Sequence, residues 1–307
     1  MISSDQVVPQ RVNGRVHRRG ALWATLQLMR PANVVTALAD VLAGFAAAAA
    51  SNWSALAWLL LATAGLYAGG VVLNDVFDAR LDAVERPERP LPRGDLSVAK
   101  AAGLGVVLLM MGIGAAFAVA PVSGLVALAA AGCAVLYDAW GKHRPFLGPL
   151  NMGLCRGLNL MLGVSAAPAL LGQRWYLALF PLVYIAAITA VSRGEVAGGR
   201  RETGLGALAL IGAVLGGVLA LGAAPGFGVV AALPFLALLA WRVLPPFWRA
   251  WRAPQPATIG RAVSAGVLSL IVLDATFAAG YAGVVYGALV LSLLPVSLRL
   301  ARAFAVT

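Results

Sequence analysis

Residues 53–82 read WSALAWLLLATAGLYAGGVVLNDVFDARLD. Residues 53–73 contain no charged side chain, and a transmembrane helix needs about 20 mostly apolar residues. Residues 74–82 then carry four charged side chains and an asparagine. The stretch therefore predicts a membrane-spanning helix that ends in an acidic cluster.

Nine further stretches have the same apolar character, and their continuous Ala- and Leu-rich runs favour helices over membrane strands. The 307 residues are 61% hydrophobic and 11% charged, whereas soluble domains carry about 25% charged residues. This composition excludes a soluble enzyme and a disordered chain. We expect an all-α polytopic membrane bundle of nine or ten transmembrane helices, and nine stays open because 262–298 is nearly continuous. The predicted spans are 31–50, 53–73, 98–120, 122–138, 148–171, 175–192, 204–222, 226–244, 262–280 and 282–298.

The chain carries 23 Lys and Arg against 12 Asp and Glu, a net charge of +11. In a soluble protein this excess would favour a nucleic-acid partner, but in a membrane protein it marks the cytoplasmic loops. With the N-terminus inside, 21 of the 23 basic residues fall on one side, whereas Arg174 alone lies in an opposite loop and Arg156 lies within a span. We therefore expect both termini inside, an even number of spans and no nucleic-acid partner. An odd number would move Arg299 and Arg302 outside.

This charge pattern also predicts the organisation of the chain. Residues 1–21 are expected to form a basic cytoplasmic tail, and residues 22–307 a single integral-membrane domain in contact with membrane lipid. The expected location is a bacterial inner membrane. Because the basic-side loops are long and carry nearly all the remaining charge, we expect the functional site on the cytoplasmic side.

The acidic cluster has the spacing of a binding site. Asp75, Asp78 and Asp82 are spaced i, i+3, i+7, which places three carboxylates on one helix face, with Asn74 at its border. Carboxylates stacked in this way repel one another unless a cation lies between them, and hard oxygen ligands suit Mg²⁺. The arginines that follow (Arg80, Arg86, Arg89 and Arg93) match phosphate oxygens. The pattern predicts a site for Mg²⁺ and a lipid diphosphate. The alternative is a charged helix end with internal salt bridges, such as Asp78 or Asp82 with Arg86.

These residues resemble the UbiA superfamily of intramembrane prenyltransferases. NDVFDARLD (74–82) looks like the family's first aspartate motif, NDxxDxxxD, and RPERPLPRG (86–94) resembles the stretch that follows it. YDAWGKHRPFLGPLNMGLCRGLNLMLG (137–163) and MRPANVVTALADVLAG (29–44) resemble further family segments. Within the superfamily, the RPANVVTALAD and SRGEV strings look most like the UbiA-like proteins encoded in ebo clusters.

The resemblance implies a helical bundle around a central cavity, with two aspartate-rich helix ends bridged by Mg²⁺ to a prenyl diphosphate. Carried over to this chain, Asn74, Asp75, Asp78 and Asp82 form the first metal and diphosphate site, and the three aspartates are the catalytic residues. Arg86, Arg89 and Lys142 are the implied phosphate contacts.

The second aspartate motif departs from the family pattern. The family has a motif close to DxxDxxGD, whereas this chain reads Ser192, Glu195 and Gly199 at the aligned positions. Glu195 is the one acid that remains, so the second metal site is weakened or is rebuilt from Glu195 and Ser192. Arg193, with Arg200 and Arg201, is an alternative direct contact for phosphate.

Three ionisable residues lie well inside predicted spans, away from their ends: Asp40, Arg156 and Asp274. Such residues usually face a partner or a cavity. Arg156 could pair with Asp40 or with Asp274 as a structural ion pair, or one carboxylate could bind the acceptor or accept a proton. Asp138, close to Lys142 at a helix end, is interpreted as a cap or a local salt bridge.

The leading function is therefore Mg²⁺-dependent transfer of a prenyl group from an allylic prenyl diphosphate to a lipophilic acceptor within the membrane. The weakened second motif keeps a second hypothesis open, a non-catalytic binder or carrier of prenylated lipid precursors. A secondary transporter is the third. It would show broken helices near the membrane midplane, whereas the polar clusters of this chain lie at helix ends.

Overall fold

The computed structural model describes residues 20–304, and this part of the chain is helical without a β-strand. The predicted basic tail, residues 1–21, lies almost wholly outside the described residues. The α-helices are α1 (Ala21–Met29), α2 (Pro31–Ala47), α3 (Trp53–Glu85), α4 (Val98–Phe117), α5 (Pro121–Ala139), α6 (Leu147–Val164), α7 (Leu171–Arg174), α8 (Leu179–Ser192), α9 (Arg201–Ala220), α10 (Val229–Arg252), α11 (Pro256–Leu268), α12 (Leu270–Ala282), α13 (Val284–Leu291) and α14 (Leu293–Ala303). Short 3₁₀ segments are η1 (Gly141–His143), η2 (Pro168–Leu170), η3 (Trp175–Ala178) and η4 (Leu221–Ala223).

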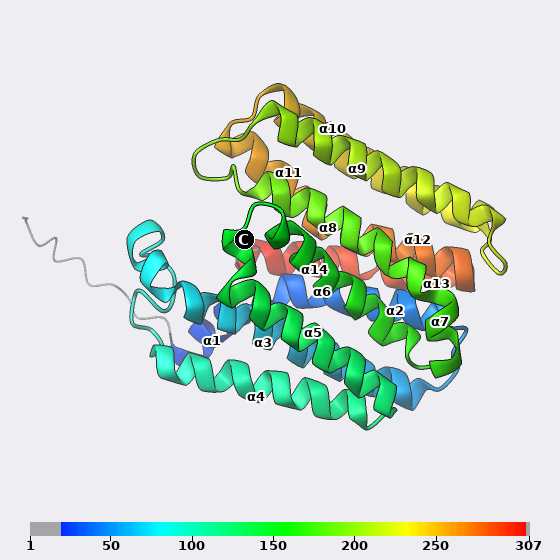
Figure 1. Ribbon diagram of the computed structural model, residues 1–307, viewed down its shortest axis with the longest axis horizontal. Helices are drawn as coiled ribbons and strands as arrows, with labels where there is room; N and C mark the ends of the chain where they lie inside the picture. Colours follow the sequence, from blue (N-terminus) through cyan, green and yellow to red (C-terminus); the bar gives the residue numbers. More distant parts are fainter. Residues whose placement is uncertain (1–19, 305–307) are drawn as a thin grey trace, which may run out of the picture.

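The helices run side by side along the long axis of the molecule, so the connections gather at its two ends (Figure 1). All ten predicted spans are helical over most of their length. Eight helices are long and apolar enough to cross a membrane, or nine if α1 and α2, bent by 42° at Arg30, count as one span. The tenth run, α6, contains Asn151, Arg156 and Asn159 and is more polar. The all-α polytopic membrane fold is thereby confirmed.

The two ends of the described chain meet at one end of the bundle. The ring of Trp23, in α1, stacks on that of Phe304, after α14, with centroids 4.7 Å apart. A chain whose described ends lie at the same end of the bundle runs along the bundle an even number of times, which agrees with ten helical runs. The ends of the described chain, residues 20–304, therefore lie at one end of the bundle, which is compatible with the prediction that both termini share one side of the membrane.

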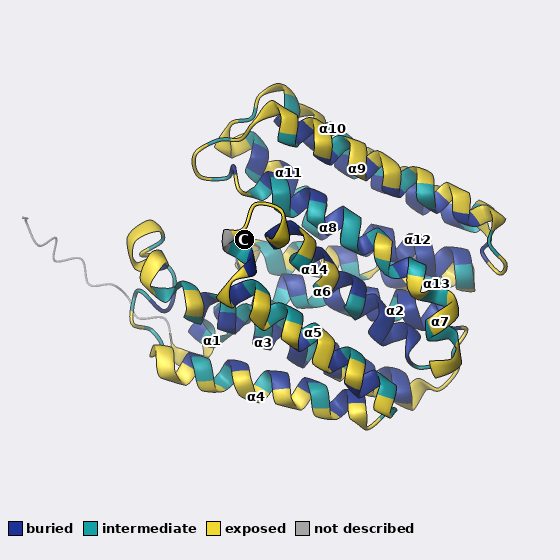
Figure 2. Cartoon of the chain, viewed as in Figure 1, coloured by how far each residue is buried: buried dark blue, intermediate teal, exposed yellow. Residues whose placement is uncertain are grey.

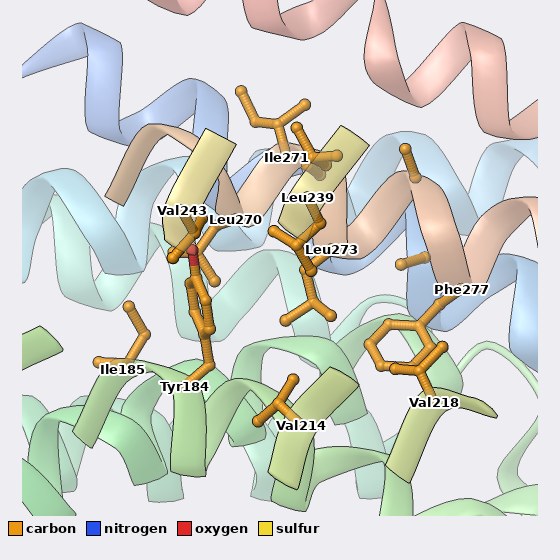
Figure 3. Close-up of a cluster of buried hydrophobic side chains, with 14 of the residues drawn as sticks. Tyr184, Ile185, Val214, Val218, Leu239, Val243, Leu270, Ile271, Leu273 and Phe277 are labelled. Atoms are coloured by element: carbon orange, nitrogen blue, oxygen red, sulfur yellow. The ribbon is translucent and has the colours of Figure 1, made fainter. Parts of the chain in front are cut away.

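Burial follows the position of each helix in the bundle (Figure 2). The span made by α11 and α12 is 83% buried, whereas the apolar windows of α4 and α10 are each 28% buried and turn large hydrophobic side chains outward. A span that is apolar on all sides, such as α11 and α12, packs inside the bundle. The outward apolar side chains of α4 and α10 suit contact with lipid. Tyr184, Leu239 and Phe277 pack in the largest core cluster, between α8, α9, α10 and α12 (Figure 3).

Helices α2 and α6 pack backbone against backbone at two glycines. A Cβ on Gly44 would lie 2.1 Å from the carbonyl oxygen of Leu160, and one on Gly163 would lie 2.2 Å from that of Val41. Small residues allow such close approach between membrane helices. This contact brings the polar side chains of α6 towards α2.

Gly44→Ala is expected to lower the free energy of unfolding by about 1–3 kcal/mol, because the methyl group forces α2 and α6 apart. Gly114→Ala is the matched control, since a Cβ there meets nothing within 4 Å and alanine favours a helix. Unfolding in a denaturing-detergent titration measures both variants. Equal stability of the two would contradict the close packing.

Candidate functional site

A cavity of about 410 Å³ lies among α2, α3, α5, α6, α8 and α11 and reaches the end of the bundle where α3 ends. Its interior is mostly apolar, and its polar side chains gather at that end and at its inner floor. The apolar lining comprises Leu66, Val71, Ala130, Ala134, Met152, Ile185, Ile188, Val263, Val267 and Leu270. The polar lining at the α3 end comprises Arg30, Asn74, Asp78, Asp82, Glu85, Arg86, Arg89, Asp138, Ser192 and Glu195.

The acidic cluster forms on one face of α3, as its spacing predicts. Helix α3 continues to Glu85, so all three aspartates belong to one helix. Asp75 and Asp82 are each 5% exposed, and Arg89 reaches both: its Nη1 lies 2.8 Å from Asp82 Oδ2 and 3.5 Å from Asp75 Oδ1. Because one guanidinium contacts both carboxylates, positions i and i+7 share the face.

Arg30 is a site residue that the sequence interpretation missed. It has φ 45°, a left-handed conformation that is uncommon for a residue with a side chain, at the bend between α1 and α2. Its Nη2 donates to Asp75 Oδ1 at 2.7 Å. The one feature of the sequence that could have pointed to Arg30 is its place in MRPAN, directly before Pro31 at the start of α2.

The end of α5 and the 3₁₀ segment η1 complete the same cluster. Lys142 Nζ lies 2.6 Å from Asp78 Oδ1, and Asn74 Nδ2 donates to Asp138 Oδ1 at 2.7 Å. Asp138 is therefore a third buried carboxylate beside Asp75 and Asp82, and Asn74 holds it. Of the cap or local salt bridge that we expected, the salt bridge with Lys142 does not form, because Lys142 pairs with Asp78. The alternative salt bridges of Asp78 or Asp82 with Arg86 do not form, because Asp78 pairs with Lys142 and Asp82 pairs with Arg89.

The segment of the weakened second motif, residues 192–201, lies across the cavity from the acidic cluster, after α8. Ser192 and Glu195 line the cavity, and Glu195 Oε1 is buried without a hydrogen-bond partner among residues 20–304. Burial raises the pKa of the Glu195 carboxyl, and the Arg86 guanidinium partly offsets that rise. Glu195 thus has a buried carboxylate oxygen without a hydrogen-bond partner at the edge of the cavity.

The remaining basic residues of that segment lie away from the cavity. Arg193 is exposed and its Nη2 donates to the carbonyl oxygen of Lys142 at 3.0 Å. Arg200 pairs with Glu202, and Arg201 donates to the carbonyl oxygen of Arg252. Arg193 therefore ties the Lys142 segment in place, and the other two arginines stay outside the site.

The donor set suits a hard cation. Among residues 20–304, no three His, Cys, Asp or Glu side chains are already gathered as a metal site, because basic groups lie between the acids. The groups themselves are carboxylate and amide oxygens, the ligands that Mg²⁺ prefers, and Glu195 Oε1 has no hydrogen-bond partner among the described residues. The residues present fit Mg²⁺ once Arg89 and Lys142 turn from the carboxylates to another anion.

A separate polar cluster lies at the floor of the cavity. Arg156 Nε lies 3.2 Å from Asp40 Oδ2, and its Nη2 donates to Thr36 Oγ1 at 3.1 Å. Asn159 Nδ2 donates to the same Asp40 oxygen at 2.8 Å. Of the two predicted partners, Asp40 therefore forms the ion pair. Asp274 is fully buried on α12, with no basic group within 4 Å among the described residues.

The sequence profile described as the UbiA prenyltransferase family matches residues 33–263, which include the acidic cluster and most of the cavity lining. The chain belongs to the UbiA prenyltransferase family. The family resemblance of NDVFDARLD and the segments around it is thereby confirmed.

Relatives and solved structures of UbiA proteins agree with this assignment. A digeranylgeranylglyceryl phosphate synthase from Ignicoccus hospitalis is 30% identical over 198 residues, 62% of this chain and 65% of that protein. The chain thus spans just under two thirds of that relative. A UbiA homologue from Aeropyrum pernix K1 superposes with TM-score 0.65 at 17% identity, over 78% of this chain and 97% of that one. A homologue from Archaeoglobus fulgidus bound to DMAPP and Mg²⁺ gives TM-score 0.52 at 18% identity, over 87% and 99%. At these identities the two structures show a shared fold.

Proposed function

We propose that this UbiA family protein is a prenyltransferase that uses Mg²⁺ to transfer a prenyl group from an allylic prenyl diphosphate to a lipophilic acceptor in the membrane. The observation that carries the proposal is the shared end of one apolar cavity, where the carboxylates of Asp78 and Asp82 lie beside the guanidinium groups of Arg86 and Arg89. The prenyl-transferring relatives and the Archaeoglobus homologue bound to DMAPP and Mg²⁺ support it.

In this proposal the acids bind the metal and the basic residues bind phosphate. Asp75, Asp78 and Asp82 are the ligands on α3, with Asn74 beside them, and Glu195 supplies a carboxylate from the facing segment. Bound Mg²⁺ would supply positive charge that stabilises the departing diphosphate. Arg193 positions the segment that carries Lys142.

Two basic residues change partners when the diphosphate binds. Arg89 and Lys142 hold carboxylates in the structure, at 2.8 Å from Asp82 and 2.6 Å from Asp78. Arginine and lysine both bind phosphate oxygens well, and Arg86, which makes no salt bridge within residues 20–304, already lines the cavity. Turning towards phosphate frees the carboxylates as ligands.

The apolar interior serves the reaction by keeping water out. Loss of diphosphate leaves an allylic cation, which water would capture. Beyond the acidic cluster the lining is mainly aliphatic, from Leu66 and Val71 on α3 to Ile185 and Ile188 on α8. A dry cavity also strengthens each electrostatic contact at its polar end.

We also propose that residues 22–307 act as one membrane domain whose site faces the cytoplasm of the cell, a bacterium by our expectation. The placement of 21 of 23 basic residues on the site's side supports this orientation. Thiol labelling of single-cysteine variants in intact cells tests it: a cysteine at position 88 is expected to be protected from impermeant reagent, and one at position 173 labelled.

Purified protein with labelled prenyl diphosphates, a panel of lipid acceptors and Mg²⁺ tests the activity. We expect a prenylated lipid with Mg²⁺ and none after chelation with EDTA. The second candidate, a binder or carrier of prenylated lipids, is favoured by one observation, the single acid Glu195 in the second segment. Tight binding of prenyl lipids without turnover across the panel would establish it in place of the transferase.

Glu195→Gln is expected to lower turnover by about 10–100-fold, the range for a group that supports a metal site. The fold should be unaffected, since Oε1 has no hydrogen-bond partner among the described residues. Glu202→Gln is the matched control, because that carboxylate is exposed and pairs with Arg200. Initial rates at saturating Mg²⁺ measure both variants, and unchanged turnover of Glu195→Gln would remove this residue from the site.

A further inference from the structure

Arg174 is an isolated charge at the end of the bundle opposite the acidic cluster, where Figure 1 shows α7 far from α1 and the C-terminus. The helix connections at this end, residues 48–52, 118–120, 165–178 and 221–228, contain Arg174 as their one charged residue. Within residues 20–304, no carboxylate lies within 4 Å of its guanidinium. The protein leaves this positive charge without compensation.

Neutral groups hold the guanidinium in place. Arg174 Nη1 lies 3.2 Å from the hydroxyl of Tyr176, 3.2 Å from that of Tyr281 and 3.4 Å from the carbonyl oxygen of Pro225. The guanidinium also lies over the Tyr281 ring, 4.7 Å from its centroid. These three contacts all use Nη1, and Nη2 makes no hydrogen bond within the described part of the chain. The side chain is therefore ordered and still has donors for an anion.

An apolar groove begins at the same place. Tyr176, which contacts Arg174, also lines a groove of about 300 Å³ between α8 and α9. The rest of the lining is Leu179, Phe180, Val183, Ala213 and Val214. From Tyr176 to Val183 the groove follows the chain for about 10 Å towards the membrane interior, at 1.5 Å per helical residue. A ligand with an anionic head and an apolar chain fits both features.

We propose that Arg174 and this groove bind one anionic phospholipid of the adjacent leaflet. The phosphate accepts hydrogen bonds from the guanidinium, the hydroxyls of Tyr176 and Tyr281 flank it, and an acyl chain lies in the groove. Arginine matches phosphate oxygens, and the groove opens to lipid rather than to water. This site is separate from the proposed transferase site, at the other end of the helices.

Native mass spectrometry of the full chain tests the site, with phosphatidylglycerol and phosphatidylcholine supplied in equal amounts. The wild type is expected to retain one lipid and to prefer phosphatidylglycerol over phosphatidylcholine roughly fivefold, the effect of one arginine near an anionic headgroup. Arg174→Gln should abolish the preference, whereas Arg302→Gln, the same change at the other end, should keep it. Ala213→Phe fills the groove without altering charge and should reduce retention at least about threefold. Ala209→Phe, one turn earlier on α9 and outside the groove, should not.

Three results would overturn the proposal. The first is an unchanged lipid preference in Arg174→Gln. The second is equal lipid retention by the Ala213→Phe and Ala209→Phe variants, which shows that no chain occupies the groove. The third is displacement of the lipid by millimolar inorganic phosphate, which shows a free-anion site. If Arg174→Gln fails to fold, the Ala213 and Ala209 pair and the phosphate competition still decide the outcome.

Discussion

Asp78→Ala is expected to lower prenyl transfer by about 10²–10³-fold, the effect of removing one preorganised electrostatic contact to a developing charge. The Asp78 carboxylate lines the cavity, and its Oδ1 pairs with Lys142 Nζ at 2.6 Å. Its side chain is 19% exposed against 6% for Asp75 and makes one ion pair, so its loss is expected to cost the fold less than the loss of Asp75. Initial rates with labelled diphosphate and Mg²⁺ measure the effect.

The comparison of three variants separates chemistry from folding. Glu88→Ala is the control, because Glu88 is exposed just beyond α3 and does not line the cavity. Asp75→Ala should lose as much activity as Asp78→Ala and also some stability, since Asp75 is buried and holds Arg30 and Arg89. Full turnover in both Asp75→Ala and Asp78→Ala would refute the mechanism.

The fold was largely predictable because the apolar length of a span is a local property of the sequence. Each of the ten predicted stretches is helical over most of its length, and the ends of the described chain meet where Trp23 stacks on Phe304, as the charge asymmetry suggested. Boundaries were less accurate. The span predicted as 148–171 is an α-helix only to Val164, where α6 ends, whereas the helix of the second span runs through the acidic cluster as predicted and on to Glu85.

The sequence predicted those features of the candidate site that lie within a single helix. The i, i+3, i+7 spacing correctly put Asp75 and Asp82 on one face, where Arg89 contacts both. Contacts between helices were not predictable: Arg30 reaches Asp75 across 45 residues, and Asn74 reaches Asp138 across 64. Those partners depend on how α1 and α5 pack against α3, and no spacing rule within a helix contains that information.

Arg156→Met is expected to lower the free energy of unfolding by about 3–5 kcal/mol, the cost of leaving a buried ion without its partner. Arg156 faces Asp40 at 3.2 Å, donates to Thr36 at 3.1 Å and lies 5.4 Å from the centroid of the Tyr67 ring. One side chain on α6 therefore joins α2 and α3 deep in the bundle. Without it, the fully buried Asp40 keeps a hydrogen bond from Asn159 and no cation. A denaturing-detergent titration measures the change.

Two further variants show whether the pair itself is responsible. Asp40→Asn combined with Arg156→Met removes both charges and should recover a large part of the lost stability, because neither ion is then left unpaired. Arg242→Met is the matched control, because Arg242 donates to Ser269 at 3.2 Å and has no carboxylate within 4 Å among the described residues. This variant should lower the free energy of unfolding by about 1 kcal/mol. If Arg156→Met unfolds like the wild type while the KM for the acceptor rises, the pair of Arg156 and Asp40 serves acceptor binding, the role that the sequence left open for a carboxylate. Loss of stability with an unchanged KM would show that the ion pair holds three helices around the cavity and takes no part in the transfer.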